Sequence, residues 1–327
     1  MINKVCVIGG GGYVGTQLVE ELLKKDYYVT VYDLFIYGNF LDKNNPKLKI
    51  IHGDVRDLKK LKDSIKNNDA IIHLACISND PSFELDPELG KSINFDCFEP
   101  LVKLSADIGI KKFIYASTSS VYGIKEEENV TEDLSLEPLT DYSKYKAKCE
   151  EILLKYKTND FTPIIIRPAT VCGMSKRLRL DLVVNIFTNF AYHKGEINVF
   201  GGKQKRPNIH IDDIVSLYIK CLNFSFNNDW DNIYNAGWEN KSLDEIANEL
   251  NILFKNNLKI NHVSTNDNRS YHISSNKLKN QLSFIPEKTI KNACEDLISY
   301  FHEAKITNTF DNDLYFNIKR MNKLNLI

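Results

Sequence analysis

The chain has 327 residues, 43% of them hydrophobic and 26% charged, so it can bury one large core or two smaller cores that share a cleft. Its 42 lysines and arginines nearly balance its 43 aspartates and glutamates, and the formal net charge is -1. This balance gives no electrostatic attraction toward nucleic acid or an anionic membrane, and we expect a small molecule as the main partner.

The N-terminus and the cysteines indicate the compartment. Residues 1–4 run directly into an apolar strand, without the basic, apolar and small-residue regions of a secretory signal. No apolar run approaches the length of a membrane span. The seven cysteines are scattered and never spaced as C-x-x-C: Cys6, Cys76, Cys97, Cys149, Cys172, Cys221 and Cys294. We therefore expect a reduced, cytoplasmic protein with neither a disulfide framework nor a zinc site.

The first half of the chain alternates short apolar runs with amphipathic stretches. The apolar runs have apolar residues at consecutive positions, which is typical of buried parallel strands, and they cover residues 5–8, 28–32, 48–51, 70–75, 113–116 and 164–166. Helical patterns fill the intervals at residues 14–24, 58–66, 93–108 and 142–156. This alternation predicts an α/β fold with a doubly wound parallel (Rossmann) sheet.

The alternation ends after Pro168. Residues 208–211 and 233–235 have strand-like patterns that could return to the sheet, whereas most of the remaining helical patterns lie in 174–205 and 241–327. We predict a large domain of residues 1–170 plus about 208–237, and a smaller mixed α/β lobe of about 171–207 plus 238–327. The active site is expected between them, beyond the carboxyl ends of the strands. The tail 311–327 is expected to dock on its own domain or on a second subunit.

A glycine-rich loop lies directly between the first predicted strand and the first predicted helix. Gly9, Gly12 and Gly15 have the spacing G-x-x-G-x-x-G, which permits a tight turn and lets backbone amides approach a pyrophosphate. Asp33 ends the second strand, where a carboxylate accepts hydrogen bonds from ribose hydroxyls and repels a 2'-phosphate. This context predicts NAD, in preference to NADP, as the cofactor.

Other polar positions have competing interpretations. Asp54 follows the third strand and is a candidate for the adenine amino group, while helix capping is an alternative for which Asp57 is the better candidate. His210 precedes Asp212 and Asp213, which together suggest a metal cluster. Their pattern also fits a strand that runs into a capped helix, and we expect no metal.

A run of hydroxyl side chains closes the fifth strand, and a tyrosine–lysine pair follows it on the next helix. Tyr142 and Lys146 are at positions i and i+4, so both project from one helix face. A free tyrosine has a pKa of about 10, so a tyrosine base near neutrality needs about 4 kcal/mol of preferential phenolate stabilisation. A neighbouring ammonium and a positive nicotinamide ring can supply it. The pair with the upstream Thr118 therefore predicts proton transfer beside a dinucleotide.

As an ordered set, these motifs resemble the extended short-chain dehydrogenase/reductase family that acts on nucleotide sugars. The resemblance covers nearly the whole chain and rests on residues 9–15, Asp54-Val55, His73-Leu74-Ala75, Asn94, residues 117–123, Tyr142-x-x-x-Lys146, residues 167–171, residues 206–213 and residues 234–237. It implies that Tyr142 is the catalytic base, that Lys146 holds the nicotinamide ribose and lowers the tyrosine pKa, and that Thr118 binds the reacting sugar oxygen.

The same resemblance implies the remaining contacts. It assigns cofactor binding to Gly9, Gly12, Tyr13, Val14, Gly15, Asp33, Asp54, Val55, Leu74, Ala75, Cys76, Asn94, Ser117, Tyr142, Lys146 and Pro168. It assigns binding of a nucleotide-diphosphate sugar to Ser78, Asn79, Thr118, Asn185, Arg206 and Arg269. A surface arginine in a loop is usually only solvated, which is the alternative for Arg206 and Arg269. The resemblance further implies a homodimer or a higher homo-oligomer, packed through residues 93–108 and 142–156.

Three functions remain open at this point. The first is a nucleotide-sugar 4-epimerase in surface polysaccharide biosynthesis, which oxidises the C4 hydroxyl with NAD and returns the hydride to the other face. The second is a 4-dehydrogenase that releases a 4-keto sugar and NADH, and the third is a silent NAD-binding regulator. Loss of water from the sugar is not expected, because Ser119 and Ser120 follow Thr118 where family dehydratases and decarboxylases usually carry an acidic residue.

Overall fold

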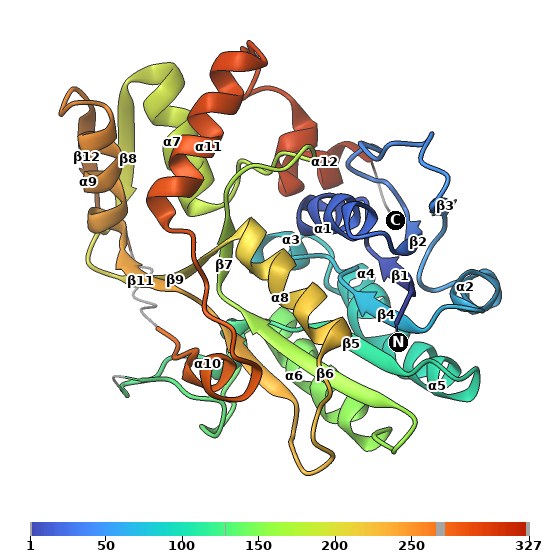
Figure 1. The fold of residues 1–327 in the computed structure, drawn as a ribbon. Coiled ribbons are helices and arrows are strands. Elements are labelled where there is room, and N and C mark those ends of the chain that lie inside the picture. The colour runs from blue at the N-terminus through green and yellow to red at the C-terminus, as the bar shows by residue number, and fades with distance from the viewer. Residues whose placement is uncertain (1, 128, 266–271, 325–327) are drawn as a thin grey trace.

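The computed structural model describes residues 2–127, 129–265 and 272–324. A parallel sheet of seven strands runs through the larger part of the molecule (Figure 1). Its order is β10 (Ile233–Ala236), β6 (Thr162–Pro168), β5 (Lys112–Ala116), β4 (Ala70–His73), β1 (Lys4–Ile8), β2 (Tyr28–Asp33) and β3 (Leu48–His52). The strand order reverses beside β1, as in a doubly wound fold. The predicted fold class is therefore confirmed.

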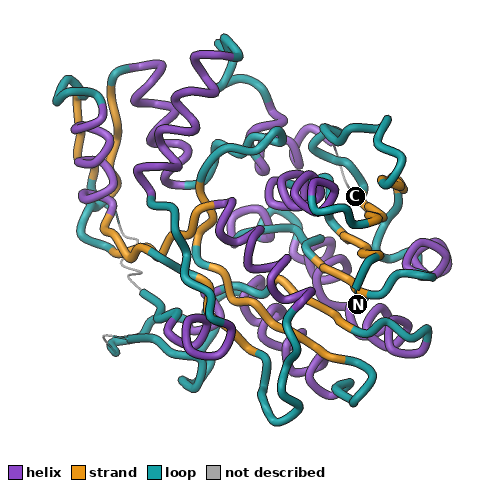
Figure 2. The backbone as a smooth tube through the Cα atoms, viewed as in Figure 1, coloured by secondary structure: helices purple, strands orange, loops and turns teal. Residues whose placement is uncertain are grey.

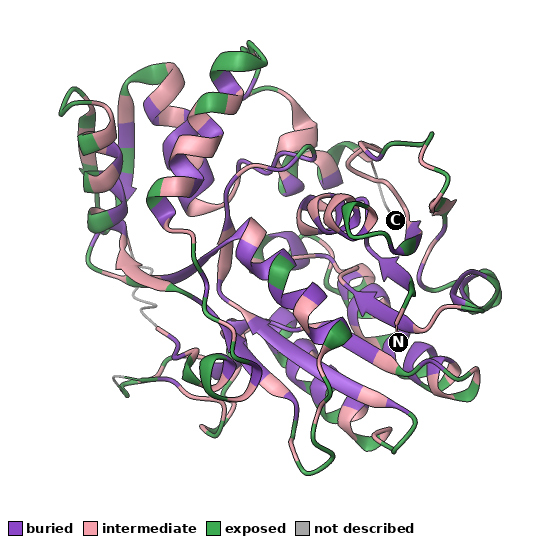
Figure 3. Ribbon diagram, viewed as in Figure 1, coloured by how far each residue is buried: buried purple, intermediate pink, exposed green. Residues whose placement is uncertain are grey.

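Helices cover both faces of this sheet because both faces are apolar. Val5 and Val7 of β1 point into one core, which also contains α1 (Tyr13–Lys24) and α8 (Ile211–Asn223). Cys6 and Ile8 point into the other core, which contains the helices α2 (Leu58–Ile65), α5 (Phe98–Asp107) and α6 (Asp141–Lys155). Figure 3 shows the resulting burial of the strands.

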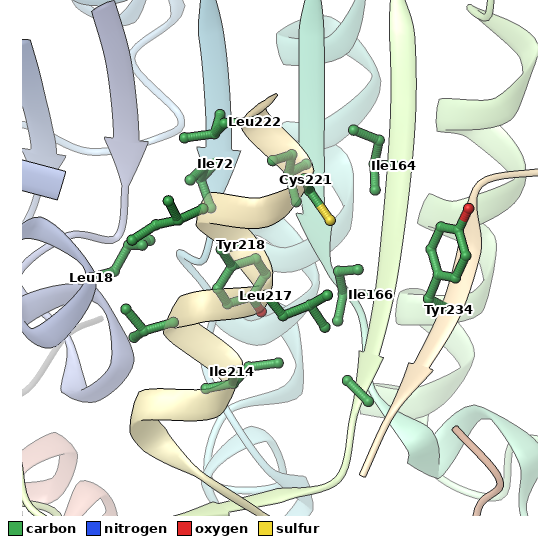
Figure 4. Packing of buried hydrophobic residues seen from close by; sticks show 14 of the residues in the cluster. Leu18, Ile72, Ile164, Ile166, Ile214, Leu217, Tyr218, Cys221, Leu222 and Tyr234 are labelled. Atoms are coloured by element: carbon green, nitrogen blue, oxygen red, sulfur yellow. The ribbon is translucent and has the colours of Figure 1, made fainter. Parts of the chain in front are cut away.

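Figure 4 shows the packing of α8 on the sheet. Leu217 and Tyr218 of this helix face Ile72 of β4 and Ile166 of β6, and all four side chains are almost completely buried. Burying one such side chain contributes about 1.5–3 kcal/mol. The helix is therefore fixed along this face of the sheet.

The smaller lobe has its own sheets and helices (Figure 2). Strands β7 (Thr170–Cys172), β9 (Lys205–His210) and β11 (Glu239–Ser242) form one sheet in the order β11-β9-β7, and β8 (Glu196–Phe200) pairs with β12 (Lys259–Val263) in another. A separate apolar core joins β7, β8 and β12 to the helices α7 (Val183–Lys194), α9 (Leu243–Leu253) and α11 (Ile290–Glu303). The lobe is thus mixed α/β.

Some expectations need correction. Residues 208–211 do not return to the large sheet, because β9 pairs with β7 and β11, whereas 233–235 do return as β10 beside β6. The predicted helix 93–108 is divided, because α4 (Pro87–Lys91) runs into a π-helical turn, η1 (Ser92–Asp96), before α5 begins. Helix α10 (Asn276–Leu282) packs on β10 of the large domain.

The C-terminal segment also returns to the large domain. It contains η3 (Asp313–Tyr315) and α12 (Asn317–Leu324), and Met321 of α12 belongs to the same buried cluster as α2, α5 and α6. Within the described residues, no helix is both long and apolar enough to cross a membrane.

Candidate active site

A cavity of about 540 Å³ lies between the two parts of the molecule. Its walls come from the glycine-rich loop, the ends of β4, β5 and β6, the start of α6 and the segment between β7 and α7. These strand ends meet at one edge of the parallel sheet, where ligands bind in doubly wound folds. The structure therefore places the cavity where the sequence predicts the active site.

The glycine-rich loop brings backbone close to the cavity. Gly9 has φ +89°, and a Cβ there would lie 2.4 Å from the Ala75 nitrogen. A Cβ on Gly15 would lie 2.3 Å from the Gly9 oxygen, so α1 can approach the loop only with glycine at this position. Gly12 precedes α1 and provides no side-chain cap. The first-turn amides can therefore serve a phosphate group.

Asp33 is held at the edge of this loop. Its Oδ2 accepts a hydrogen bond from the Gly11 amide at 2.9 Å, and its Oδ1 accepts one from the Phe35 amide at 2.6 Å. Burial raises the pKa of Asp33, and these two amides act in the opposite direction. The carboxylate is thus fixed at the carboxyl end of β2, which is the position expected for a ribose-binding group.

Tyr142 and Lys146 lie on one face of α6, as their spacing predicts, and both line the cavity. Helix α6 begins after Thr140, whose hydroxyl forms a capping box with Ser143 and fixes the start of the helix. The Lys146 ammonium donates to the Ala116 carbonyl at 2.7 Å and lies 5.9 Å from the centre of the Tyr142 ring.

The protein alone does not make Tyr142 acidic. Burial, followed by the nearby Cys76 and Asp80, raises the pKa of Tyr142 well above its ordinary value, and Arg179 and the Asn79 backbone act in the opposite direction. Formation of the phenolate near neutral pH therefore needs further positive charge in the cavity.

Thr118 and Ser117 form the cavity wall at the end of β5. The Ser120 amide donates to the Thr118 Oγ1 at 3.2 Å. Ser117 donates to Glu150, which also forms a buried pair with Arg167 at 2.6 Å. This ion pair anchors the floor of the site from α6 and β6.

Most of the predicted cofactor residues line the cavity: Gly9, Gly12, Tyr13, Val14, Gly15, Leu74, Cys76, Ser117, Tyr142, Lys146 and Pro168. Among the predicted substrate residues, the cavity wall contains Ser78, Asn79, Thr118 and Arg206. Arg269 lies outside the described residues. The binding roles of all these residues remain predictions.

Five predicted cofactor residues do not line the cavity, namely Asp33, Asp54, Val55, Ala75 and Asn94. Asn94 binds both backbone groups of Ile77 and so supports the loop after β4. Asp54 pairs with Arg56 at 2.6 Å, and the buried Val55 and the half-buried Ala75 are likewise absent from the wall.

Asn185, predicted to bind substrate, is completely buried. Its amide nitrogen donates to the Tyr13 hydroxyl at 3.1 Å and to the Arg179 carbonyl at 2.8 Å, and its oxygen accepts from the Gly173 amide at 3.0 Å. These protein contacts occupy the amide group, so the structure gives Asn185 a supporting position.

The sequence reasoning missed several cavity residues, namely Tyr37, Asp80, Arg177, Arg179 and Asn317. The close arginines in Lys176-Arg177-Leu178-Arg179 were the available signal, because two cations in one short loop suit a diphosphate. Asn317 carried no such signal, since only the path of the C-terminal segment brings it to the cavity.

His210 caps α8, as the pattern predicts, because its Nδ1 accepts from the Asp212 amide at 3.1 Å. His210, Asp212 and Asp296 nevertheless place potential ligand atoms within 4.8 Å of one another. The Lys288 ammonium lies 2.6 Å from Asp212 and 3.5 Å from Asp296, so it already neutralises part of this charge. Absence of a metal remains a prediction.

Comparison with known proteins identifies the family. The model of the NAD dependent epimerase/dehydratase family matches residues 5–237. The chain belongs to this family. The match includes the glycine-rich loop, Thr118, Tyr142 and Lys146, so NAD is the cofactor and the chain is an NAD-dependent enzyme of the epimerase/dehydratase type.

The curated relatives include enzymes with different reactions. The chain is 26% identical to a UDP-glucose 4-epimerase of Lactobacillus helveticus over 72% of this chain and 76% of that protein. It is 27% identical to a UDP-N-acetyl-alpha-D-glucosaminuronate decarboxylase of Bacillus cytotoxicus, over 93% of this chain and 99% of that protein. Against the uncharacterized protein y4nG of Sinorhizobium fredii it is 29% identical, and there the match spans 54% of the relative.

Solved structures agree in fold. A UDP-glucose 4-epimerase of Thermotoga maritima with UDP-glucose superposes with a TM-score of 0.83 at 21% identity, covering 93% of this chain and 100% of that one. A UDP-glucuronic acid 4-epimerase of Bacillus cereus, in complex with UDP-glucuronic acid and NAD, gives a TM-score of 0.80 at 25% identity, covering 92% and 99%.

Proposed function

We propose that this enzyme is a nucleotide-sugar 4-epimerase. The observation that supports this most is the position of Tyr142 and Lys146, which share one face of α6 and line the same cavity as Thr118 and the glycine-rich loop. This set of groups can move a proton and orient a sugar hydroxyl beside a dinucleotide.

The residues present fit NAD. The close approach at Gly9 and Gly15 and the uncapped first turn of α1 suit its pyrophosphate, and Asp33 suits its ribose hydroxyls. When bound, NAD supplies a hydride acceptor and a positive charge. We propose that Asp54 and the other residues predicted to bind NAD either contact the cofactor or hold the residues that contact it.

In the proposed reaction, the phenolate oxygen of Tyr142 takes the proton of the C4 hydroxyl, and Thr118 donates to the C4 oxygen. The Lys146 ammonium stabilises the phenolate electrostatically and orients the cofactor ribose. The hydride removed from C4 returns to the opposite face of the 4-keto sugar, and Tyr142 returns the proton. The product is the C4 epimer, and the cofactor ends in its starting oxidation state.

Removal of water or of carbon dioxide needs a further acid or base. Ser119 and Ser120 follow Thr118 in the cavity wall, and neither is acidic. Asp181 accepts hydrogen bonds from Arg179 at 2.6 Å and from the backbone amide of Asn317 at 2.8 Å. Asp80 accepts a hydrogen bond from the Thr140 hydroxyl at 2.5 Å. Both wall carboxylates therefore already accept hydrogen bonds from the protein, whereas epimerisation needs no acid or base besides Tyr142.

We propose a sugar linked to UDP as the substrate, because the named relatives and structures above carry UDP-sugars in their names. Arg206 lines the cavity and is the proposed contact for the diphosphate, together with Arg269. Surface polysaccharide biosynthesis in the cytoplasm is the proposed role.

The decisive experiment incubates the purified enzyme with UDP-glucose, UDP-N-acetylglucosamine and UDP-glucuronic acid, followed by GDP-, CDP- and dTDP-sugars. NMR reports the configuration at C4, and absorbance reports NADH. Inversion at C4 without accumulated NADH is expected. A ketone with an equal amount of NADH would instead identify a 4-dehydrogenase, and no turnover with any of these sugars would favour a silent NAD-binding protein.

We also propose a homodimer packed through α5 and α6. These helices carry partly exposed apolar side chains at Leu104, Tyr145 and Ile152, and Tyr156 directly follows α6. Sedimentation of the wild type at micromolar concentration is expected to show a dimer, and Ile152→Glu is expected to shift it to monomer. A wild-type monomer contradicts this assembly.

A further inference from the structure

Arg177 is a buried cation that has no carboxylate partner among the described residues. It lies between β7 and α7, and only 2% of its surface is exposed. Its Nη2 donates to the Asn317 Oδ1 at 2.7 Å, its guanidinium carbon lies 3.9 Å from the centre of the Tyr37 ring, and its Nε has no partner. A cation removed from water in this way is unfavourable unless an anion meets it.

The nearest carboxylate of the same loop is already used. Asp181 accepts from the Arg179 Nε at 2.6 Å and, through its other oxygen, from the backbone amide of Asn317. Arg179 is also buried, and its Nη2 has no partner. This loop therefore contributes two buried guanidinium groups and one carboxylate, which pairs with Arg179 alone, so the positive charge of Arg177 is left without a carboxylate partner in the described part of the chain.

The surroundings of Arg177 place it on the cofactor side of the cavity. It lines the same cavity as Gly9 and Gly12. Its guanidinium lies over Tyr37, which follows β2, and its charge acts on Tyr13, the first residue of α1, and on Asp33, which accepts from the Gly11 amide. Burial, followed by the charge of Arg179, lowers the pKa of Arg177 to about 10, so it remains a cation at neutral pH.

We propose that Arg177 binds the pyrophosphate of NAD from the side opposite the glycine-rich loop, and that the C-terminal helix α12 holds it there through Asn317. A guanidinium fork suits a diphosphate, since it offers several donors in one plane. The loop amides and this guanidinium then enclose the diphosphate from two sides.

Helix α12 is well placed for this role, because it fastens three separate segments. Asn317 Nδ2 donates to the Ser78 hydroxyl after β4, while the same side chain accepts from Arg177. Arg320 donates to the Ile36 carbonyl after β2 and to Asp313. Figure 1 shows α12 between the helices of the smaller lobe and the β1–β2 side of the large domain. The C-terminal segment therefore retains the cofactor, which suits an enzyme that reuses one NAD molecule.

The first test is Arg177→Met, which keeps an apolar chain against Tyr37 and removes the charge. After removal of co-purified NAD, calorimetry measures the affinities for NAD, ADP-ribose and UDP. NAD and ADP-ribose share the pyrophosphate, so both are expected to weaken about 10- to 100-fold, the range for lost hydrogen bonds to a charged group, and UDP is expected to be unchanged. Weakening of UDP alone, or unchanged affinity for NAD, overturns the proposal.

A thermal melt separates this role from a structural one. The cofactor-free variant is expected to melt close to the wild-type temperature or above it, because replacing a buried cation that lacks a carboxylate partner with an apolar side chain is often neutral or stabilising. The stabilisation by added NAD is expected to shrink. A lower melting temperature with a full stabilisation by NAD would make Arg177 merely structural and overturn the proposal.

The second test concerns the helix and does not depend on the first variant. Asn317→Ala is expected to release NAD at least tenfold faster, while Lys319→Ala, an exposed change on the same helix, is expected to behave as wild type. Retention of NAD is measured after gel filtration. Equal retention by Asn317→Ala and the wild type contradicts the role of α12. Neither test depends on the reaction, so both remain valid if the enzyme is not an epimerase.

Discussion

Replacing Tyr142 with phenylalanine removes one oxygen from the site and little else. The ring packs edge-on against Phe83, at 6.4 Å between ring centres, and phenylalanine preserves this contact. Loss of a positioned general base reduces the rate about 100- to 10000-fold, which corresponds to about 3–5 kcal/mol on the barrier. Because the glycine-rich loop is unchanged, we expect the affinity for NAD to stay near the wild-type value.

The pH dependence gives this experiment a second measurement. Burial, together with Cys76 and Asp80, raises the pKa of Tyr142 well above its ordinary value. The wild-type kcat/KM is therefore expected to rise as pH rises through the neutral range, as more phenolate forms, and the residual activity of Tyr142→Phe is expected to lose this dependence. Removal of the ammonium by Lys146→Met should shift the wild-type profile to higher pH and weaken NAD binding.

Tyr145→Phe is the matched control. Tyr145 lies on the same helix but stacks on Phe95, at 5.0 Å between ring centres, and does not line the cavity. Initial rates of C4 inversion, followed by NMR, are expected to be nearly those of the wild type. If Tyr142→Phe also stays within a few-fold of the wild type across pH, the assignment of the base is wrong.

Further predictions concern cofactor choice and stability. Asp33→Ser combined with Leu34→Arg is expected to narrow the preference for NAD over NADP, measured as the ratio of the two dissociation constants; a wild-type preference for NADP contradicts the role of Asp33. Glu150→Ala leaves Arg167 charged and buried and is expected to lower the free energy of unfolding by about 3–5 kcal/mol, measured by urea denaturation; a loss below about 1 kcal/mol, typical of exposed pairs, would be inconsistent with this account. Burial, followed by the charge of Lys146, lowers the pKa of His73 to about 3 in the folded protein. The imidazole of the unfolded chain, with a pKa of about 6.5, therefore binds a proton that the folded protein does not bind, and the free energy of unfolding falls as pH drops below about 6.5. The expected loss at pH 5 is about 2 kcal/mol, and His73→Phe should flatten this slope in denaturant titrations; an unchanged slope argues against it.

The sequence alone determined the features that depend on neighbouring residues. The glycine spacing, the apolar strands and the pair Tyr142 and Lys146 are local patterns, because a strand–turn–helix unit and one helix face are fixed within a few residues. The family and its cofactor followed from the order of these patterns along the chain.

The tertiary structure decided the contacts between distant segments. A strand-like pattern does not specify its partner, so only pairing with β7 and β11 places β9 in the smaller sheet. Arg177 meets Asn317 across 140 residues of chain, a contact that no periodicity encodes. Asn185 likewise is turned toward protein groups by the packing around it. Residues whose environment is built from several segments acquire their role only when burial brings those segments together.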